Sequence, residues 1–299
     1  MNVLKKILNV MNDSTNLKIT LLQKFAWLFK DDKEFLQKLY VLNFGYTPDF
    51  DNPQTFNEKL NWIKLHDRKP IYTKMADKYN VKQYVAGIIG DEYVVPCYGV
   101  YDSFDDIDFS NLPDQFVMKA THDSGGATVC RDKKTFDYKA AKKKFELNLK
   151  RDYFLPNREW PYKDIPSKII IDKYLDDHTG KELRDYKFWC INGIPTYMYC
   201  TIKGDNVFEN FYDMNFRPVM IDHGFPRHSP EFEKPAEFEL MKTLASKLAK
   251  EAPAFIRIDF FDVDGHVYFG EFTFYDWAGL RPFKDYETDL KLGEMIHLI

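Results

Sequence analysis

The residues best suited to chemistry lie near the C-terminus, in two predicted strands, Phe255–Val263 and Val267–Phe274. Successive side chains of a strand point to opposite faces of a sheet. One face of this pair is apolar and suits a core; it holds Ile256, Ile258, Phe260, Tyr268, Phe272 and Phe274. The other face holds Arg257, Asp259, Glu271 and Thr273. This second face is the first candidate for an active site.

The connection between the two strands decides whether the acids face each other. A three-residue loop, Asp264-Gly265-His266, sets Asp259 opposite Glu271 and is the predicted arrangement. A two-residue turn without a bulge would instead pair Asp259 with Gly270 and turn Glu271 to the other face. Facing carboxylates repel, but a hard cation such as Mg²⁺ between them, bridging to phosphate oxygens, makes the arrangement tolerable. The alternative interpretation is a solvated hairpin face.

A second chemical element is the segment Phe116–Cys130, in which Lys119 interrupts an apolar strand and Ser124-Gly125-Gly126 follows. Glycine backbone lets amides approach phosphate oxygens closely, and the lysine supplies a point charge. A lysine snorkelling beside an ordinary turn would look similar. The segment is neither the G-x-x-x-x-G-K-[ST] loop nor the G-x-G-x-x-G turn. It predicts an anion site of another kind.

A third element is the apolar strand Ile169–Leu175, which carries Asp172 and is followed by a polar loop and the segment Leu183–Trp189. Such a strand can present backbone groups to the edge of a purine, and an acid downstream can hold ribose hydroxyls. The pattern is not specific by itself, because a strand with charged ends is usually only a strand.

The elements that must position these residues begin with helices. Residues 1–46 are predicted to be helical, Thr55-Phe-Asn-Glu58 is a capping-box pattern that opens another helix, and Asp77–Ile89 is a third. Strands are predicted at 93–100, 116–120, 128–131, 168–175, 186–191 and 196–202, and helices at 137–152 and 235–251. Asn192-Gly193 is a strong hairpin signal. Mixed elements without strict alternation predict an α+β or mixed α/β protein with a helical N-terminal region, residues 1–90.

Composition excludes several classes of protein. The 299 residues include 42 basic and 46 acidic side chains, so the net charge of −4 gives no general attraction to nucleic acid. Four widely spaced cysteines indicate reduced thiols in a cytoplasmic protein. No apolar run approaches the ~20 residues of a membrane span. Residues 1–11 do not resemble a signal peptide; an amphipathic helix packed on the protein is favoured, with peripheral contact at the inner membrane face as the alternative.

In this order the elements resemble the ATP-grasp superfamily, in which two α+β lobes clamp ATP. The resemblance implies that Lys78, in the pair Asp77-Lys78, and Lys119 bind phosphate. It assigns the phosphate loop to Ser124, Gly125 and Gly126. It also assigns the adenine hinge to Asp172, Lys173, Tyr174 and Leu175.

The same resemblance covers the nucleotide sugar and the metal. The ribose acid is either Glu182 or Asp185, and Asp185 is favoured because it begins the following strand. Lys187 shares a strand face with Asp185 and is a further candidate for nucleotide contact, with a surface lysine as the plain alternative. The pattern Arg-x-Asp then Glu-x-Asn is matched by Arg257, Asp259, Glu271 and Thr273, with threonine in place of asparagine.

A closer resemblance covers nearly the whole chain. It is carried by the segments Asn52–Lys59, Ala76–Tyr79, Phe116–Lys119, Asp185–Phe188 and Gly270–Thr273. These segments are similar to the teichuronopeptide-biosynthesis (TupA-like) ATP-grasp proteins of bacterial surface-polysaccharide gene clusters, which are often labelled glycosyltransferases. Asp123 stands where that family more often has glycine, and Asp172 where it has glutamate. The implied ATP-grasp domain is 91–299, with a small lobe at 112–180 and a large lobe at 181–299.

The activity implied is carboxylate activation with ATP and Mg²⁺ as cofactors. A sugar acid or polysaccharide precursor forms an acyl phosphate, which an amino acid or amine converts to an amide in capsule, O-antigen or teichuronic-type polymer. Lys119 and Arg257 are the implied catalytic residues, and Asp259, Glu271 and Thr273 the implied metal ligands. The alternative for Arg257 is a salt bridge to Asp259.

Two other functions remain open at this point. One is a transferase on the same polymer, either a sugar kinase or a glycosyltransferase. The other is a non-catalytic nucleotide-binding partner of a polysaccharide assembly complex. The sequence does not identify the carboxylate, the amine or the oligomeric state.

Overall fold

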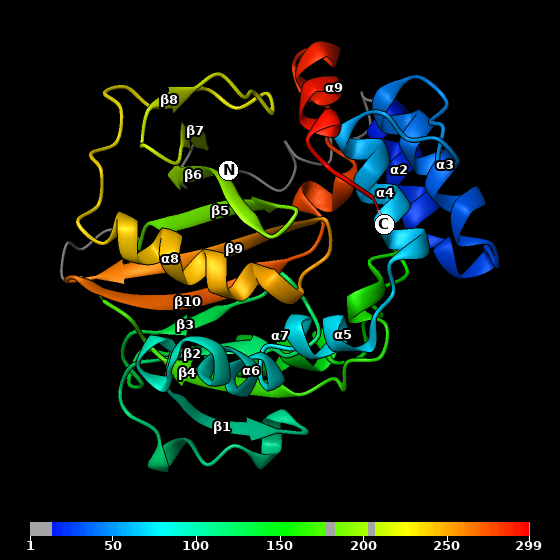
Figure 1. Cartoon of the computed structure of the whole chain (residues 1–299). Coiled ribbons are helices and arrows are strands. Elements are labelled where there is room, and N and C mark those ends of the chain that lie inside the picture. The colour runs from blue at the N-terminus through cyan, green and yellow to red at the C-terminus, as the bar shows by residue number, and fades with distance from the viewer. Residues whose placement is uncertain (1–13, 177–182, 203–206, 299) are drawn as a thin grey trace.

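The computed structural model describes residues 14–176, 183–202 and 207–298 (Figure 1). The predicted helix at residues 1–11 and the ribose candidate Glu182 lie outside these ranges. The helices are α2 Ser14–Lys24, α3 Asp32–Phe44, α4 Phe56–His66, α5 Pro70–Ala76, α6 Asn80–Ile89, α7 Tyr138–Asn148, α8 Phe238–Leu248 and α9 Tyr286–Glu294. Within the described ranges, no helix is both long enough and apolar enough to cross a membrane.

The strands form two antiparallel sheets. The smaller has the order β1-β4-β2-β3, with β1 Cys97–Tyr101, β2 Phe116–Ala120, β3 Thr128–Cys130 and β4 Ile169–Lys173. The larger has the order β10-β9-β5-β6-β7-β8, with β5 Asp185–Ile191, β6 Ile194–Ile202, β7 Phe208–Asp213, β8 Pro218–Val219, β9 Phe255–Val263 and β10 His266–Thr273. Figure 1 shows the larger sheet above the smaller one, with α8 lying across the larger. We propose that the two sheets are the cores of the two lobes, the smaller beginning at β1.

Local signals explain where the helices start. Thr55 and Glu58 form the predicted capping box, in which each side chain accepts a hydrogen bond from the other residue's backbone amide. Helix α6 starts at Asn80 rather than at the predicted Asp77, because the Asp77 carboxylate accepts hydrogen bonds from the amides of Tyr79 and Asn80. Asp77 is therefore the C-cap of α5, and its carboxylate fixes the backbone that leads into α6.

The hairpin of β9 and β10 sets Asp259 opposite Glu271, as predicted. The predicted cause is wrong, however. The connection is a two-residue turn at Asp264-Gly265, with φ of 53° and 81°, and not a three-residue loop. A β-bulge at Gly270 shifts the register by one residue and restores the facing of the two acids.

The bulge also changes which residues of β10 belong to the core. Val267 and Phe269 are buried before it, and Phe272 and Phe274 after it. Tyr268, which was predicted to be in the core, is only partly buried on the opposite face. The alternation of side chains therefore changes phase at Gly270, as an extra residue in one strand requires.

Among the helices and strands named above, α5, β7, β8 and α9 were not predicted. Helix α9 is tied to α4 by hydrogen bonds that join distant parts of the chain. Asp289 Oδ1 accepts from the backbone amide and the side-chain amide of Asn57, at 3.0 and 3.1 Å. Lys59 Nζ donates to the carbonyl oxygens of Gly293 and Ile296, at 2.8 and 2.9 Å. The N-terminal helices are thus fastened to the C-terminal end.

We expect Gly270→Ala to lower the free energy of unfolding by about 1–3 kcal/mol, the range for an extra methyl group in a tightly packed region. A Cβ at Gly270 would stand 3.1 Å from Asp259 O and 3.2 Å from the Phe261 ring. Urea unfolding measures the change. Gly87→Ala is the matched control: nothing lies within 4 Å of its Cβ in α6, so stability should rise by up to ~1 kcal/mol. Equal stability of Gly270→Ala and the parent would contradict the close packing of the bulge.

Candidate functional site

A cavity of about 570 Å³ lies between the two sheets. Its walls include Lys78, Lys119, Ser124, Gly125, Gly126 and Asp172 on the side of the smaller sheet. On the side of the larger sheet they include Asp185, Lys187, Arg257, Asp259 and Glu271. All of these were candidates in the sequence, so the fold brings the predicted elements to one place.

The other candidates in the described ranges do not line this cavity. Lys173 is exposed at the end of β4, where its backbone amide donates to Pro96 O at 2.8 Å. Tyr174 packs under Arg131, with 5.7 Å between the guanidinium carbon and the ring centroid. Leu175 is half-buried, and Thr273 lies opposite Arg257 in the hairpin. Their roles at the hinge and at the metal stay predictions.

The phosphate loop is shaped by Asp123 and two glycines. Gly125 has φ 77°, in the region that favours glycine, and a Cβ on Gly126 would stand 2.5 Å from Asp123 Oδ2. Lys78 Nζ donates to the carbonyl oxygen of Asp123 and lies 3.7 Å from its Oδ1. Burial lowers the pKa of Lys78, and the charge of Glu271 opposes that effect. The loop and Lys78, which it binds through Asp123, therefore lie together at the wall of the cavity.

The carboxylate of Asp172 forms ion pairs with two lysines. Its carboxylate lies 2.9 Å from Lys82 Nζ and 3.1 Å from Lys119 Nζ, and its side chain is 4% exposed. The acid therefore orients Lys119, the lysine predicted to bind phosphate. Lys82 also lines the cavity and was missed by sequence reasoning. Its spacing of four residues from Lys78, across the start of α6, was the signal that could have found it.

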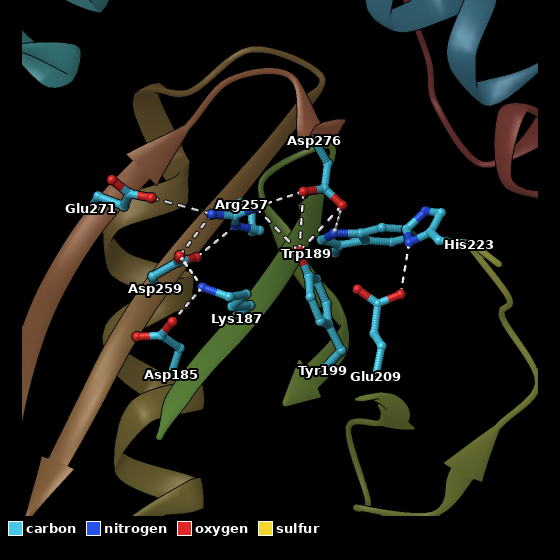
Figure 2. A network of polar contacts seen from close by, with 10 residues as sticks. All are labelled: Asp185, Lys187, Trp189, Tyr199, Glu209, His223, Arg257, Asp259, Glu271 and Asp276. Atoms are coloured by element: carbon cyan, nitrogen blue, oxygen red, sulfur yellow. Dashed lines mark hydrogen bonds and ion pairs between the residues drawn. The ribbon is translucent and has the colours of Figure 1, made fainter. Parts of the chain in front are cut away.

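Asp259 is held by two cations on the opposite wall (Figure 2). It accepts from Arg257 Nε at 2.7 Å, from Arg257 Nη2 at 2.8 Å and from Lys187 Nζ at 2.8 Å. Burial alone would raise the pKa of Asp259, but the charges of Arg257 and Lys187 outweigh burial and lower it. Lys187 also donates to Asp185 at 3.1 Å. The Arg257–Asp259 salt bridge, weighed as the alternative role of the arginine, is thus present.

Arg257 reaches two further carboxylates. Its Nη2 donates to Glu271 at 3.3 Å and its Nη1 to Asp276 at 2.6 Å (Figure 2). Burial would lower the pKa of Arg257, but Asp259 and the neighbouring acceptors raise it well above its ordinary value. Asp276 was missed by sequence reasoning, because its contact with Arg257 depends on a turn that no spacing rule describes.

The charges of the cluster fit a divalent cation. Two cationic side chains, Lys187 and Arg257, are set among four carboxylates, Asp185, Asp259, Glu271 and Asp276. Negative charges outnumber positive ones in this cluster, which suits a divalent cation. Among the described residues no three acidic, histidine or cysteine side chains form a ready-made metal site. Mg²⁺ typically takes only one or two carboxylates together with phosphate oxygens, and Asp259 with Glu271 would supply them.

Residues 58–297 match the family described as TupA-like ATPgrasp. The match begins inside α4 and includes all the cavity residues named above. It confirms the predicted resemblance, and with the two sheets and their helices it confirms the predicted α+β fold. No match was found among curated proteins.

Solved structures with a similar arrangement include a D-alanine–D-alanine ligase of Bacillus anthracis complexed with ATP. It is 18% identical, with a TM-score of 0.41 over 74% of this chain and 64% of that one. The D-alanine–D-alanine ligase of Helicobacter pylori is 14% identical, with a TM-score of 0.44 over 82% and 68%. An N5-carboxyaminoimidazole synthetase of Staphylococcus aureus complexed with ADP is 14% identical, with a TM-score of 0.42 over 75% and 52%. The likenesses are distant, so the family match carries the assignment.

Proposed function

We propose, from the premise that the chain belongs to the TupA-like ATP-grasp family, that it is an ATP- and Mg²⁺-dependent carboxylate–amine ligase. One observation carries this proposal. Lysines from the smaller sheet and carboxylates with an arginine from the larger sheet line opposite walls of the same cavity. A triphosphate with a metal ion needs cations at the phosphates and carboxylates at the metal, and this cavity offers both.

The first step is phosphoryl transfer to a carboxylate. The acceptor carboxylate oxygen attacks the γ-phosphorus, the bond to the β-phosphate oxygen breaks, and ADP leaves. Lys78 and Lys119 neutralise phosphate charge, and the loop Ser124, Gly125 and Gly126 offers backbone amides. Asp259 and Glu271, with Thr273, are the proposed metal ligands, and Mg²⁺ when bound supplies further charge neutralisation at the phosphates. Such transfer depends mainly on positioning and charge, so no protein nucleophile is required.

The second step forms the amide. The amine nitrogen attacks the carbonyl carbon of the acyl phosphate and loses a proton, and the carbon–oxygen bond to phosphate breaks. Negative charge develops on the carbonyl oxygen in this step. Arg257 lies beside the proposed metal ligands and can donate two parallel hydrogen bonds to that oxygen or to the departing phosphate. On the nucleotide, Asp185 is proposed to hold the ribose, with Lys187 beside it, and Asp172, Lys173, Tyr174 and Leu175 to form the adenine hinge.

The substrates are proposed from the resemblance to the teichuronopeptide-biosynthesis ATP-grasp proteins and from the family match. The carboxylate is that of a sugar acid or polysaccharide precursor, and the amine is an amino acid or a related compound. The product is then part of a bacterial surface polysaccharide. Such precursors and ATP meet in the cytoplasm, where we place the protein, with peripheral contact at the inner membrane face as a further possibility.

Trapping with hydroxylamine tests the reaction class. Incubation with ATP, Mg²⁺ and a panel of uronic acids should release ADP only with an accepted acid, and hydroxylamine should convert the intermediate to a hydroxamate. A sugar kinase would release ADP and leave a phosphate ester without hydroxamate, whereas a glycosyltransferase, given a nucleotide sugar in a parallel incubation, would release a nucleoside diphosphate. Either of these outcomes would exclude the ligase. A protein that binds ATP without any of the three products would be the non-catalytic alternative.

A further inference from the structure

Arg257 is held by Asp276 from the side away from Glu271 (Figure 2). Asp276 Oδ1 accepts from Arg257 Nη1 at 2.6 Å and from the Tyr199 hydroxyl at 3.1 Å, and Oδ2 accepts from the Trp189 indole at 3.1 Å. Asp276 is 2% exposed, so solvent screens its charge little. Arg257 has two other carboxylate partners, Asp259 and Glu271, and both are proposed metal ligands. Asp276 is therefore the partner that the arginine keeps when those acids bind a metal.

The backbone that carries Asp276 is an unusual turn, Asp276–Gly279. Trp277 and Ala278 have φ of 48° and 56°, in the left-handed region that non-glycine residues seldom adopt. Gly279 has φ 58°, and a Cβ there would stand 2.9 Å from Leu60 Cβ in α4. Such a conformation persists only where the surrounding structure holds it.

Helix α4 provides that hold through two buried side chains. Lys64 Nζ donates to Ala278 O at 2.6 Å and to Asn61 Oδ1 at 3.1 Å. Asn61 Nδ2 donates to Gly279 O at 2.7 Å. Both side chains are fully buried, and burial lowers the pKa of Lys64 to about 8. Packing alone would favour an apolar side chain here, so the oxygens that accept from Lys64, together with the nearby charge of Glu159, explain why an ammonium stands at this place.

We infer that Asp276 is a positioning residue for Arg257, and that Lys64 and Asn61 keep it in place by holding the Asp276–Gly279 turn. The contacts run without a gap from α4 to the turn, from the turn to the acid, and from the acid to the guanidinium. The catalytic role of Arg257 in this inference rests on the proposed function, whereas the contacts that hold Arg257 do not depend on it. Helix α4 thereby affects the reaction indirectly, through the position of Arg257.

The hold is tested by the mobility of the Arg257 guanidinium. NMR of the arginine Nε–Cζ group, in the full chain without ligands, reports rotation of the guanidinium about this bond. Asp276→Asn, Lys64→Met and the milder Asn61→Ala should each speed this rotation relative to the parent. Lys59→Met is the matched control, because Lys59 lies on the same helix and also donates to two carbonyl oxygens, but in the segment 293–296 and not in the turn. It should leave the rotation unchanged.

Kinetics give the second readout. Asp276→Asn should lower kcat for hydroxamate formation by about 100-fold, as expected when a transition-state contact is misplaced, with little change in KM for ATP. Lys64→Met and Asn61→Ala should lower kcat in the same direction and Lys59→Met should not. Unchanged Arg257 rotation in folded Asp276→Asn and Asn61→Ala would overturn the inference. Faster rotation in a protein whose parent form yields no hydroxamate would uphold the positioning and reject the proposed function, so the two failures are distinct.

Discussion

Glu271→Gln should lower turnover by at least ~100-fold, the range seen when a contact to transition-state charge is removed. The change keeps the shape of the side chain and removes one negative charge opposite Asp259. Glutamine is a poor ligand for a hard dication, so the metal contact is lost while the fold is kept. Initial rates of ADP release with an accepted acid measure the effect. In a Mg²⁺ titration, the variant should need a higher Mg²⁺ concentration than the parent for half-maximal turnover. Chelation of the metal should stop turnover in the parent.

Stability separates this effect from damage to the fold. Glu271 is 38% exposed and 3.3 Å from Arg257, so its ion pair contributes no more than about 1 kcal/mol, and its loss relieves repulsion from Asp259. We expect unchanged or slightly higher stability without metal. Glu287→Gln, which removes an exposed acid paired with Lys291 on α9, is the control and should keep full activity. A folded, fully active Glu271→Gln protein would show that this acid is not a metal ligand.

Arg257→Lys should retain ATP binding and lose most of the ligation, by about 100-fold or more. Arg257 donates to Asp259, Glu271 and Asp276 at once, and a planar guanidinium is needed to point in these directions. Lysine keeps the charge but has neither the planar fork nor the reach. The phosphate lysines lie on the opposite wall, so the affinity for ATP with Mg²⁺, measured by calorimetry, should stay within a few-fold of the parent.

The split between binding and ligation is the informative result. The yield of hydroxamate per ADP released should fall in Arg257→Lys, because more of the acyl phosphate is hydrolysed by water before hydroxylamine attacks it. Arg227→Lys, at a half-buried arginine that is paired with Glu231 and does not line the cavity, is the matched control and should be unchanged. Equal losses of ATP affinity and ligation would instead assign Arg257 to nucleotide binding.

Much of the site was predictable because its residues stand on strands with plain alternation. The placing of Lys119 on a strand followed from the period-two pattern, whereas the facing of Asp259 and Glu271 was predicted correctly but from a three-residue loop that the structure does not have. The shape of the hairpin did not follow, because turn length and bulge compensate each other and the acids face each other either way. Gly270, an isolated glycine within a strand, was the available signal for the bulge.

Other parts of the site could not be reached by such rules. Lys64 sits in a helix where a lysine normally faces water, yet it is fully buried. Asp276 follows a strand in a stretch that matches no sequence motif. Its contact with Arg257 depends on left-handed backbone at Trp277 and Ala278. Asp172 was assigned to the hinge, but its salt bridges to Lys82 and Lys119 depend on where the fold places α6, which carries Lys82, relative to β2 and β4. Each of these contacts is set by tertiary structure.

The fastening of α4 to the C-terminal end has a consequence for how the protein becomes active during its synthesis. The hydrogen bonds from Asn61 and Lys64 to the Asp276–Gly279 turn span 218 and 214 positions, and that from Asn57 to Asp289 spans 232. A ribosome releases the chain from its N-terminus, and contacts across such separations form late. A nascent chain therefore has its phosphate lysines well before its arginine is secured. Arg257 is therefore secured only after the segment 276–289 has been synthesised and has packed on α4.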